Sequence, residues 1–61
     1  MKLKDKLLKS ARIGRRVTIV LNEIRFTGKI ISISTETIQL DTGQYQPEIG
    51  LSGIVAFFFE E

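Results

Sequence analysis

Apolar residues at alternating positions between residues 15 and 43 constrain the fold of this chain more than any other feature. Val17, Ile19 and Leu21 have the period of two that is expected of a β-strand with one buried face. Their neighbours Thr18 and Val20 are β-branched, which suits a pleated strand. The pattern predicts a first strand over about 16–21.

The second predicted strand, over about 24–34, is too long to remain flat. Ile24 and Ile30 share one parity and Ile33 takes the other, so the buried face must switch along the strand. Gly28 lies close to that switch, and a glycine inside a strand favours a bend or a bulge. A strongly bent second strand predicts a small barrel.

Short polar segments separate the strands. We expect Asn22 to take a left-handed backbone in a tight hairpin, and Gly43 can take a positive φ in a later turn. Pro47 cannot donate a hydrogen bond to a ladder, so the strand that contains it is predicted at an edge. The fold expected is mainly β, an antiparallel five-stranded small barrel with strands at about 16–21, 24–34, 37–42, 46–51 and 54–59.

The residues before the first strand predict an amphipathic helix over about 2–13, ended by Gly14 in a left-handed cap. Its apolar residues recur at helical spacing, and its basic residues lie mostly on the opposite face. Three interpretations of the basic face remain open: a solvated lid on one end of the barrel, a contact to nucleic-acid phosphates, or a membrane-surface contact. The apolar residues are Leu3, Leu7, Leu8 and Ala11.

The chain of 61 residues is predicted as one domain, residues 1–61, with marginal stability because a chain of this size buries little surface. It contains no cysteine and no histidine, so it has neither a disulfide nor the usual zinc ligands. We expect no metal and no cofactor, and self-association as the remaining source of stability. No signal peptide or membrane span is apparent, so we expect a cytoplasmic protein with no membrane partner.

Charge is distributed unevenly along the chain. Residues 1–16 carry seven Lys or Arg and one Asp, a net charge of +6, whereas residues 17–61 carry two Lys or Arg and six Asp or Glu, a net charge of −4. Such asymmetry suggests either an anionic partner or head-to-tail attraction between copies.

The last predicted strand is apolar on both faces and would be an aggregation hazard if it were uncovered. Either the N-terminal helix covers one side or another copy pairs along this edge. We therefore expect a homo-oligomer whose interface includes Ile54, Ala56, Phe57, Phe58 and Phe59.

A basic helix followed by five short strands, with a glycine in a long second strand, resembles the Sm-like (LSm) family of small barrels. The segments VTIVL at 17–21, FTGKI at 26–30 and IQL at 38–40 are similar to the first Sm motif, and LSG at 51–53 falls where the second motif lies. The resemblance covers nearly the whole chain. It implies a ring that binds single-stranded RNA.

The chain departs from the family at positions that contact a base. Ser34 and Thr37 stand where the first motif usually has Asp and Asn, and Ser52 stands at the basic position of the second motif. The histidine-bearing motif of the bacterial RNA-chaperone branch is absent. Hydrophobic strands around one glycine also occur in KOW-type and PRC-type barrels.

Single-strand recognition calls for cations and for flat groups on which bases stack. A structural alternative stands beside each candidate: a solvated sheet face or an intermolecular ion pair for Arg25 and Lys29, a turn for Ser34 and Thr37, and strand entry for Tyr45. The candidate RNA-binding residues are Lys4, Lys9, Arg15, Arg16, Arg25, Lys29, Ser34, Thr37, Tyr45 and Ser52.

Catalysis is not expected. No spacing pairs two carboxylates for acid–base work, the serines have no base to activate them, and the glycines form no phosphate-binding loop. We expect no catalytic residue and no small-molecule substrate. Two hypotheses remain: a ring-forming protein that binds single-stranded RNA, and a structural or protein-interaction oligomer of phage or bacterial origin that binds no RNA.

Overall fold

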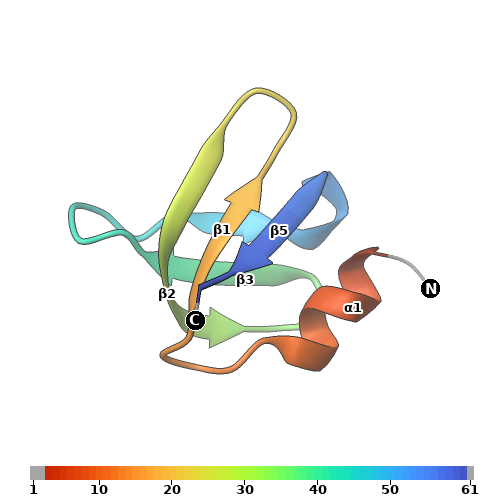
Figure 1. Ribbon diagram of the computed structural model, residues 1–61, viewed down its shortest axis with the longest axis horizontal. Helices are drawn as coiled ribbons and strands as arrows, with labels where there is room; N and C mark the ends of the chain where they lie inside the picture. Colours follow the sequence, from red (N-terminus) through yellow and green to blue (C-terminus); the bar gives the residue numbers. More distant parts are fainter. Residues whose placement is uncertain (1–2, 61) are drawn as a thin grey trace.

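A computed structural model describes residues 3–60 and has one short helix followed by an antiparallel sheet (Figure 1). The fold is mainly β, as the alternating pattern predicts. The elements are α1 (Leu3–Ser10), β1 (Arg16–Val20), β2 (Arg25–Ile33), β3 (Thr37–Asp41), β4 (Glu48–Gly50), the 3-10 turn η1 (Leu51–Gly53) and β5 (Ala56–Phe59).

The five strands form one sheet in the order β4-β3-β2-β1-β5, in which every neighbouring pair is antiparallel. The five antiparallel strands are as predicted, but the sheet does not close into the predicted small barrel, because within residues 3–60 β4 and β5 do not pair and both remain edge strands. β4 has three residues and is joined to β5 through η1. Figure 1 shows that the sheet is strongly bent, so that β3 lies at a large angle to β1 and β5.

Gly28 and the bulge in β2 occupy separate positions. The register between β2 and β3 shifts between Ile30 and Ser32, so the change of buried face occurs at Ile31, beyond the glycine. At Gly28, a Cβ atom would lie 2.8 Å from the carbonyl carbon of Asp41, and closer still to its oxygen. Gly28 is therefore needed because the backbone of β3 approaches it, and the bend belongs to the bulge.

The helix ends at Ser10, earlier than the predicted end at Ile13, and its predicted start at Lys2 lies outside the described residues. Gly14 has the expected positive φ of 89°, but in a turn after the helix, where Arg15 N–H bonds the carbonyl of Arg12 at 3.1 Å. Gly14 N–H then donates to the carbonyl of Ile30 at 2.7 Å. Ile30 N–H donates in turn to the carbonyl of Arg15 at 3.0 Å, so the turn after the helix is bonded to β2.

The other turns are partly as predicted. Gly43 has a φ of 97°, as expected for its turn. Asn22 does not take a left-handed backbone, because within residues 3–60 only glycines have positive φ. The hairpin is closed instead by Leu21 N–H donating to the carbonyl of Ile24 at 2.7 Å. No helix in the described part of the chain is long and apolar enough to cross a membrane.

One apolar cluster lies inside the curve of the sheet, and α1 covers it. Leu7 of the helix is fully buried and Ala11, just beyond it, is 4% exposed, which agrees with the predicted apolar face. Figure 1 places α1 at one end of the sheet. The remaining members of the cluster are Val17, Ile19, Ile30, Ile38, Leu40, Ile49, Leu51 and Ile54.

Candidate nucleic-acid interface

Three segments that are distant in sequence meet around one hollow. It has a volume of about 340 Å³ and is lined by Lys4 of α1, Glu36 and Thr37 at the start of β3, and Ser52 of η1. Leu51 N–H donates to the carbonyl of Glu36 at 2.8 Å, and this bond holds η1 against the turn before β3. We call this hollow the Lys4 hollow. Among residues 3–60 its lining offers one cation, one carboxylate and two hydroxyls, and no aromatic ring.

Ser34 stabilises the turn beside the Lys4 hollow. Its Oγ accepts hydrogen bonds from Thr37 N–H at 2.9 Å and from Glu36 N–H at 3.3 Å, and it lies 3.1 Å from Thr37 Oγ1. Such bonds satisfy backbone donors that the turn would otherwise leave to water. The structure therefore gives Ser34 the turn role that stood as its alternative. Thr37 Oγ1 contacts Ser34 and also lies 3.4 Å from Glu48 Oε2.

A second hollow, of about 230 Å³, contains two neighbouring cations. Arg16 of β1 and Lys29 of β2 are cross-strand partners, and Asp41, Thr42 and Gly43 complete the lining. Asp41 is in turn the cross-strand partner of Lys29 on β3, and its Oδ1 accepts the N–H of Gly43 at 2.9 Å. We call this the Arg16 hollow.

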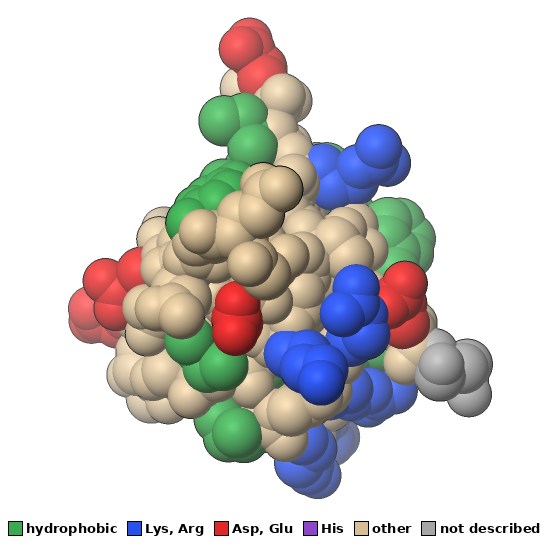
Figure 2. Space-filling model, turned by 90° about the vertical axis from the view of Figure 1, so that its left-hand side faces the viewer, with side chains coloured by type: hydrophobic (Ala, Val, Ile, Leu, Met, Phe, Trp, Pro, Cys, Tyr) green, Lys and Arg blue, Asp and Glu red, His purple; other side chains and the backbone are tan. Residues whose placement is uncertain are grey.

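The basic residues of α1 and of the turn after it add to the positive surface. Figure 2 shows Lys and Arg side chains gathered in one region of the molecular face, with acidic side chains beside them. Lys9 is exposed in the last turn of the helix. Arg15 has structural contacts, because one of its guanidinium N–H groups donates to the carbonyl of Ser10 at 3.1 Å and its Cζ lies 4.0 Å from the ring centroid of Phe59.

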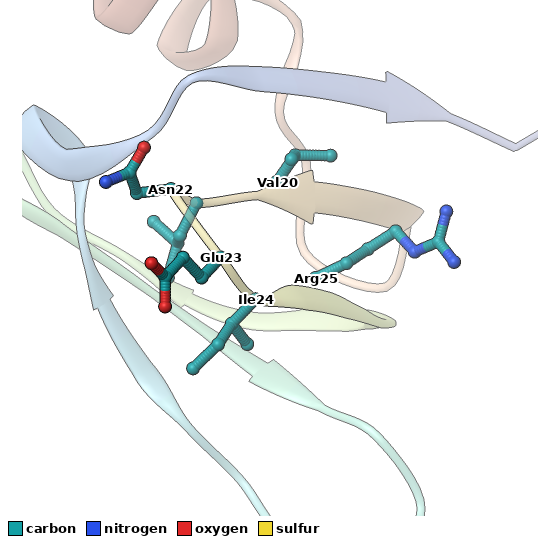
Figure 3. Close-up of a pocket in the computed structure, with 6 residues that line it drawn as sticks. Val20, Asn22, Glu23, Ile24 and Arg25 are labelled. Carbon is teal, nitrogen blue, oxygen red and sulfur yellow. The ribbon is translucent and has the colours of Figure 1, made fainter.

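Arg25 and Tyr45 lie apart from both hollows. Arg25 is the first residue of β2 and lines a third hollow, of about 530 Å³, at the β1–β2 hairpin. Figure 3 shows its guanidinium extending away from Asn22 and Glu23. Tyr45 is 54% exposed and packs edge-on against Phe26, with ring centroids 6.2 Å apart. Arg25 and Tyr45 were predicted from the sequence as RNA-binding residues, but the structure places them away from the residues that line the two hollows.

The predicted interface residues of the last strand have different environments. Ile54 precedes β5 and is 9% exposed, as part of the core. Phe57 and Phe59 pack against the core, and their rings meet edge-on with centroids 5.5 Å apart. Ala56 is partly buried. Phe58 alone among them is largely exposed, at 63%.

Sequence reasoning did not assign Glu36 and Glu60 to a site. Glu36 lines the Lys4 hollow, and Glu60 forms an ion pair with Arg16. The position of Glu36 directly after Ser34 and Thr35 could have suggested a place beside the candidate site. The ion pair of Glu60 with Arg16 could not be anticipated in this way, because it depends on the pairing of β5 with β1. Within residues 3–60 no cluster of His, Cys, Asp or Glu could hold a metal ion.

Comparison with known proteins gives no match: no family model matches the sequence, and neither does any curated protein or any solved structure. The resemblance to the Sm-like family therefore remains a prediction based on the residues quoted above.

Proposed function

We propose that this chain is an Sm-like protein that assembles into a ring and binds single-stranded RNA, mostly through charge. The observation that carries the proposal is the Lys4 hollow, where Lys4, Thr37 and Ser52 come together from three separate elements. A cation and hydroxyl groups at one place can contact a phosphate and the edge of an unpaired base. The proposal includes a cytoplasmic location, where such RNA is available.

The Arg16 hollow and the basic helix support the same function. Their Lys and Arg side chains would neutralise phosphates beyond the nucleotide held at the Lys4 hollow, which adds affinity and salt sensitivity. The described residues that line the Lys4 hollow include no aromatic ring on which a base could stack. We therefore expect weak binding with little base preference.

The open sheet edges support assembly into a ring. β4 and β5 lie at opposite edges of one sheet, and within residues 3–60 no other strand pairs with their outer sides. If β5 of one copy pairs with β4 of the next, every interface is head-to-tail, and such interfaces close into a ring when the rotation permits. The exposed ring of Phe58 would be buried at this contact.

RNA binding is tested by titrating fluorescent oligo-U, oligo-A and a mixed-sequence single strand, with anisotropy read at two salt concentrations. The variant Lys4→Gln with Arg16→Gln removes one cation from each hollow. We expect it to weaken binding and to reduce the salt slope by about 1.4, because each phosphate contact in a single strand contributes about 0.7.

A matched control removes the same charge elsewhere. Arg12→Gln with Arg25→Gln changes two exposed cations that lie outside α1 and line neither hollow. We expect this control to lose less than half as much affinity as the variant with Lys4→Gln and Arg16→Gln. Equal losses in the two variants would contradict the assignment to the hollows, and no binding of wild-type protein to any oligonucleotide at low salt would refute RNA binding.

The second candidate function is a structural or protein-interaction oligomer without RNA binding. It is favoured by the mixed charge of the Lys4 hollow, because the carboxylate of Glu36 would repel a phosphate. Ser52 also favours it, because the Sm-like family usually has a basic residue at this position. A ring mass by light scattering, together with no oligonucleotide binding at low salt, would select it over the first.

A further inference from the structure

An ion pair joins the end of β5 to the start of β1, at the margin of the Arg16 hollow. Arg16 Nε donates to Glu60 Oε2 at 2.6 Å, and Glu60 N–H donates to the carbonyl of Arg16 at 3.1 Å. It is the one ion pair among residues 3–60. The backbone bond places Glu60 so that its carboxylate reaches the guanidinium.

The position of Glu60 matters because Arg16 and Lys29 are adjacent cations. Residues directly opposite on neighbouring strands have side chains on the same face, and like charges there destabilise the pairing. Asp41 lies opposite Lys29 on β3 and Glu60 lies beside Arg16. The two cations are thus flanked by two carboxylates. The four side chains together have no net charge while both carboxylates remain in place.

The two carboxylates are held differently. Asp41 Oδ1 accepts the N–H of Gly43 at 2.9 Å, so this carboxylate is part of the turn after β3. Glu60 makes its side-chain contact through Arg16 alone among the described residues, and both side chains of the pair are 50% exposed. Glu60 can therefore leave without disturbing a turn, whereas Asp41 cannot.

We propose that Glu60 competes with the phosphate groups of a bound polynucleotide for Arg16, and so lowers the affinity of the Arg16 hollow. This inference rests on the proposed function. A phosphate oxygen that replaces the carboxylate on Arg16 lies next to Lys29 and can contact both cations. No covalent step is involved, only the exchange of one anion for another.

The expected effect is small and measurable. An exposed ion pair contributes little, so breaking it before RNA binds lowers affinity by about fivefold or less. Glu60→Gln removes the competing charge, and we expect it to tighten binding by about twofold to fivefold per site at low salt. The gain should shrink as added salt screens both the pair and the phosphates.

The control must separate competition at Arg16 from a general change in charge. Glu23→Gln removes the same charge from an exposed residue at the β1–β2 hairpin, at the opposite end of β1 from Arg16. We expect it to tighten binding by less than half as much as Glu60→Gln. In protein that already carries Arg16→Gln, the effect of Glu60→Gln should fall to that of the control.

The assay is anisotropy with fluorescent oligo-U, and light scattering on the same samples gives the assembled mass. Equal gains from Glu60→Gln and Glu23→Gln would overturn the competition while leaving RNA binding intact. Failure of both wild-type protein and Glu60→Gln to bind would refute the proposed function and the inference together. A changed mass with unchanged affinity per site would assign Glu60 to subunit contact and would also overturn the inference.

Discussion

Replacing Gly28 with alanine tests how closely the backbones of β2 and β3 approach. The added Cβ would lie 2.8 Å from the carbonyl carbon of Asp41 and 3.1 Å from Cα of Thr42, with the Asp41 oxygen closer still. All of these are backbone atoms, so no side chain can rotate away. Relief requires the two strands to separate near the pair of Lys29 with Asp41.

The cost can be estimated from these contacts. Overpacking a tight site costs about 1–3 kcal/mol, and backbone neighbours favour the upper end. Alanine is better than glycine in a strand by about 0.5–1 kcal/mol, so the net loss is about 2 kcal/mol. A domain of this size has a free energy of unfolding of only about 3–9 kcal/mol. With an m-value of about 1 kcal/mol/M, the urea midpoint should fall by about 2 M.

The assay is urea unfolding followed by far-UV circular dichroism at one fixed protomer concentration, because assembly also stabilises the fold. Gly50→Ala is the matched control, since Gly50 has φ −71° and ψ 126° and a Cβ there would meet nothing within 4 Å. We expect the control to be neutral or stabilising by up to about 1 kcal/mol. A midpoint for Gly28→Ala at or above that of wild type would refute the close approach of the strands.

Two further substitutions test the helix and the assembly. Leu7→Ala should lower the free energy of unfolding by about 2–5 kcal/mol, because Leu7 is fully buried under α1, and an unchanged urea midpoint would contradict the helix packing. Phe58→Glu should reduce the assembled mass in light scattering to that of a monomer while changing monomer stability by only about 0.5 kcal/mol, because the ring is 63% exposed. Val55→Glu, at a residue that is 60% exposed and precedes β5, is its control, and a soluble ring in Phe58→Glu would refute the contact.

Local patterns predicted each strand to within two residues at either end. Alternation, turn residues and the amphipathic face of the helix depend on neighbours in sequence, which is why these features can be recognised from the sequence alone. Gly43 is a further example, because the positive φ of its turn depends only on residues adjacent in sequence. Asn22 shows the limit, since its hairpin closes by another geometry.

The candidate site depended much more on the tertiary structure. Arg16 meets Lys29 because of the register between β1 and β2, and Ser52 meets Thr37 because η1 bonds to the turn before β3. Arg25 carries the same charge as Lys29 on the same strand, yet the hairpin places it at another hollow. Residue type alone could not distinguish these positions.

Local features of the sequence are enough to identify the strand-forming segments and the apolar face of the helix, and the sequence contains neither cysteine nor histidine. Three features follow only from the folded arrangement of residues 3–60: β4 and β5 do not pair, the bulge lies at Ile31, and Glu60 reaches Arg16. Propensity and periodicity act over a few neighbouring residues, whereas strand order and register depend on contacts between residues distant in sequence, here up to 44 positions apart.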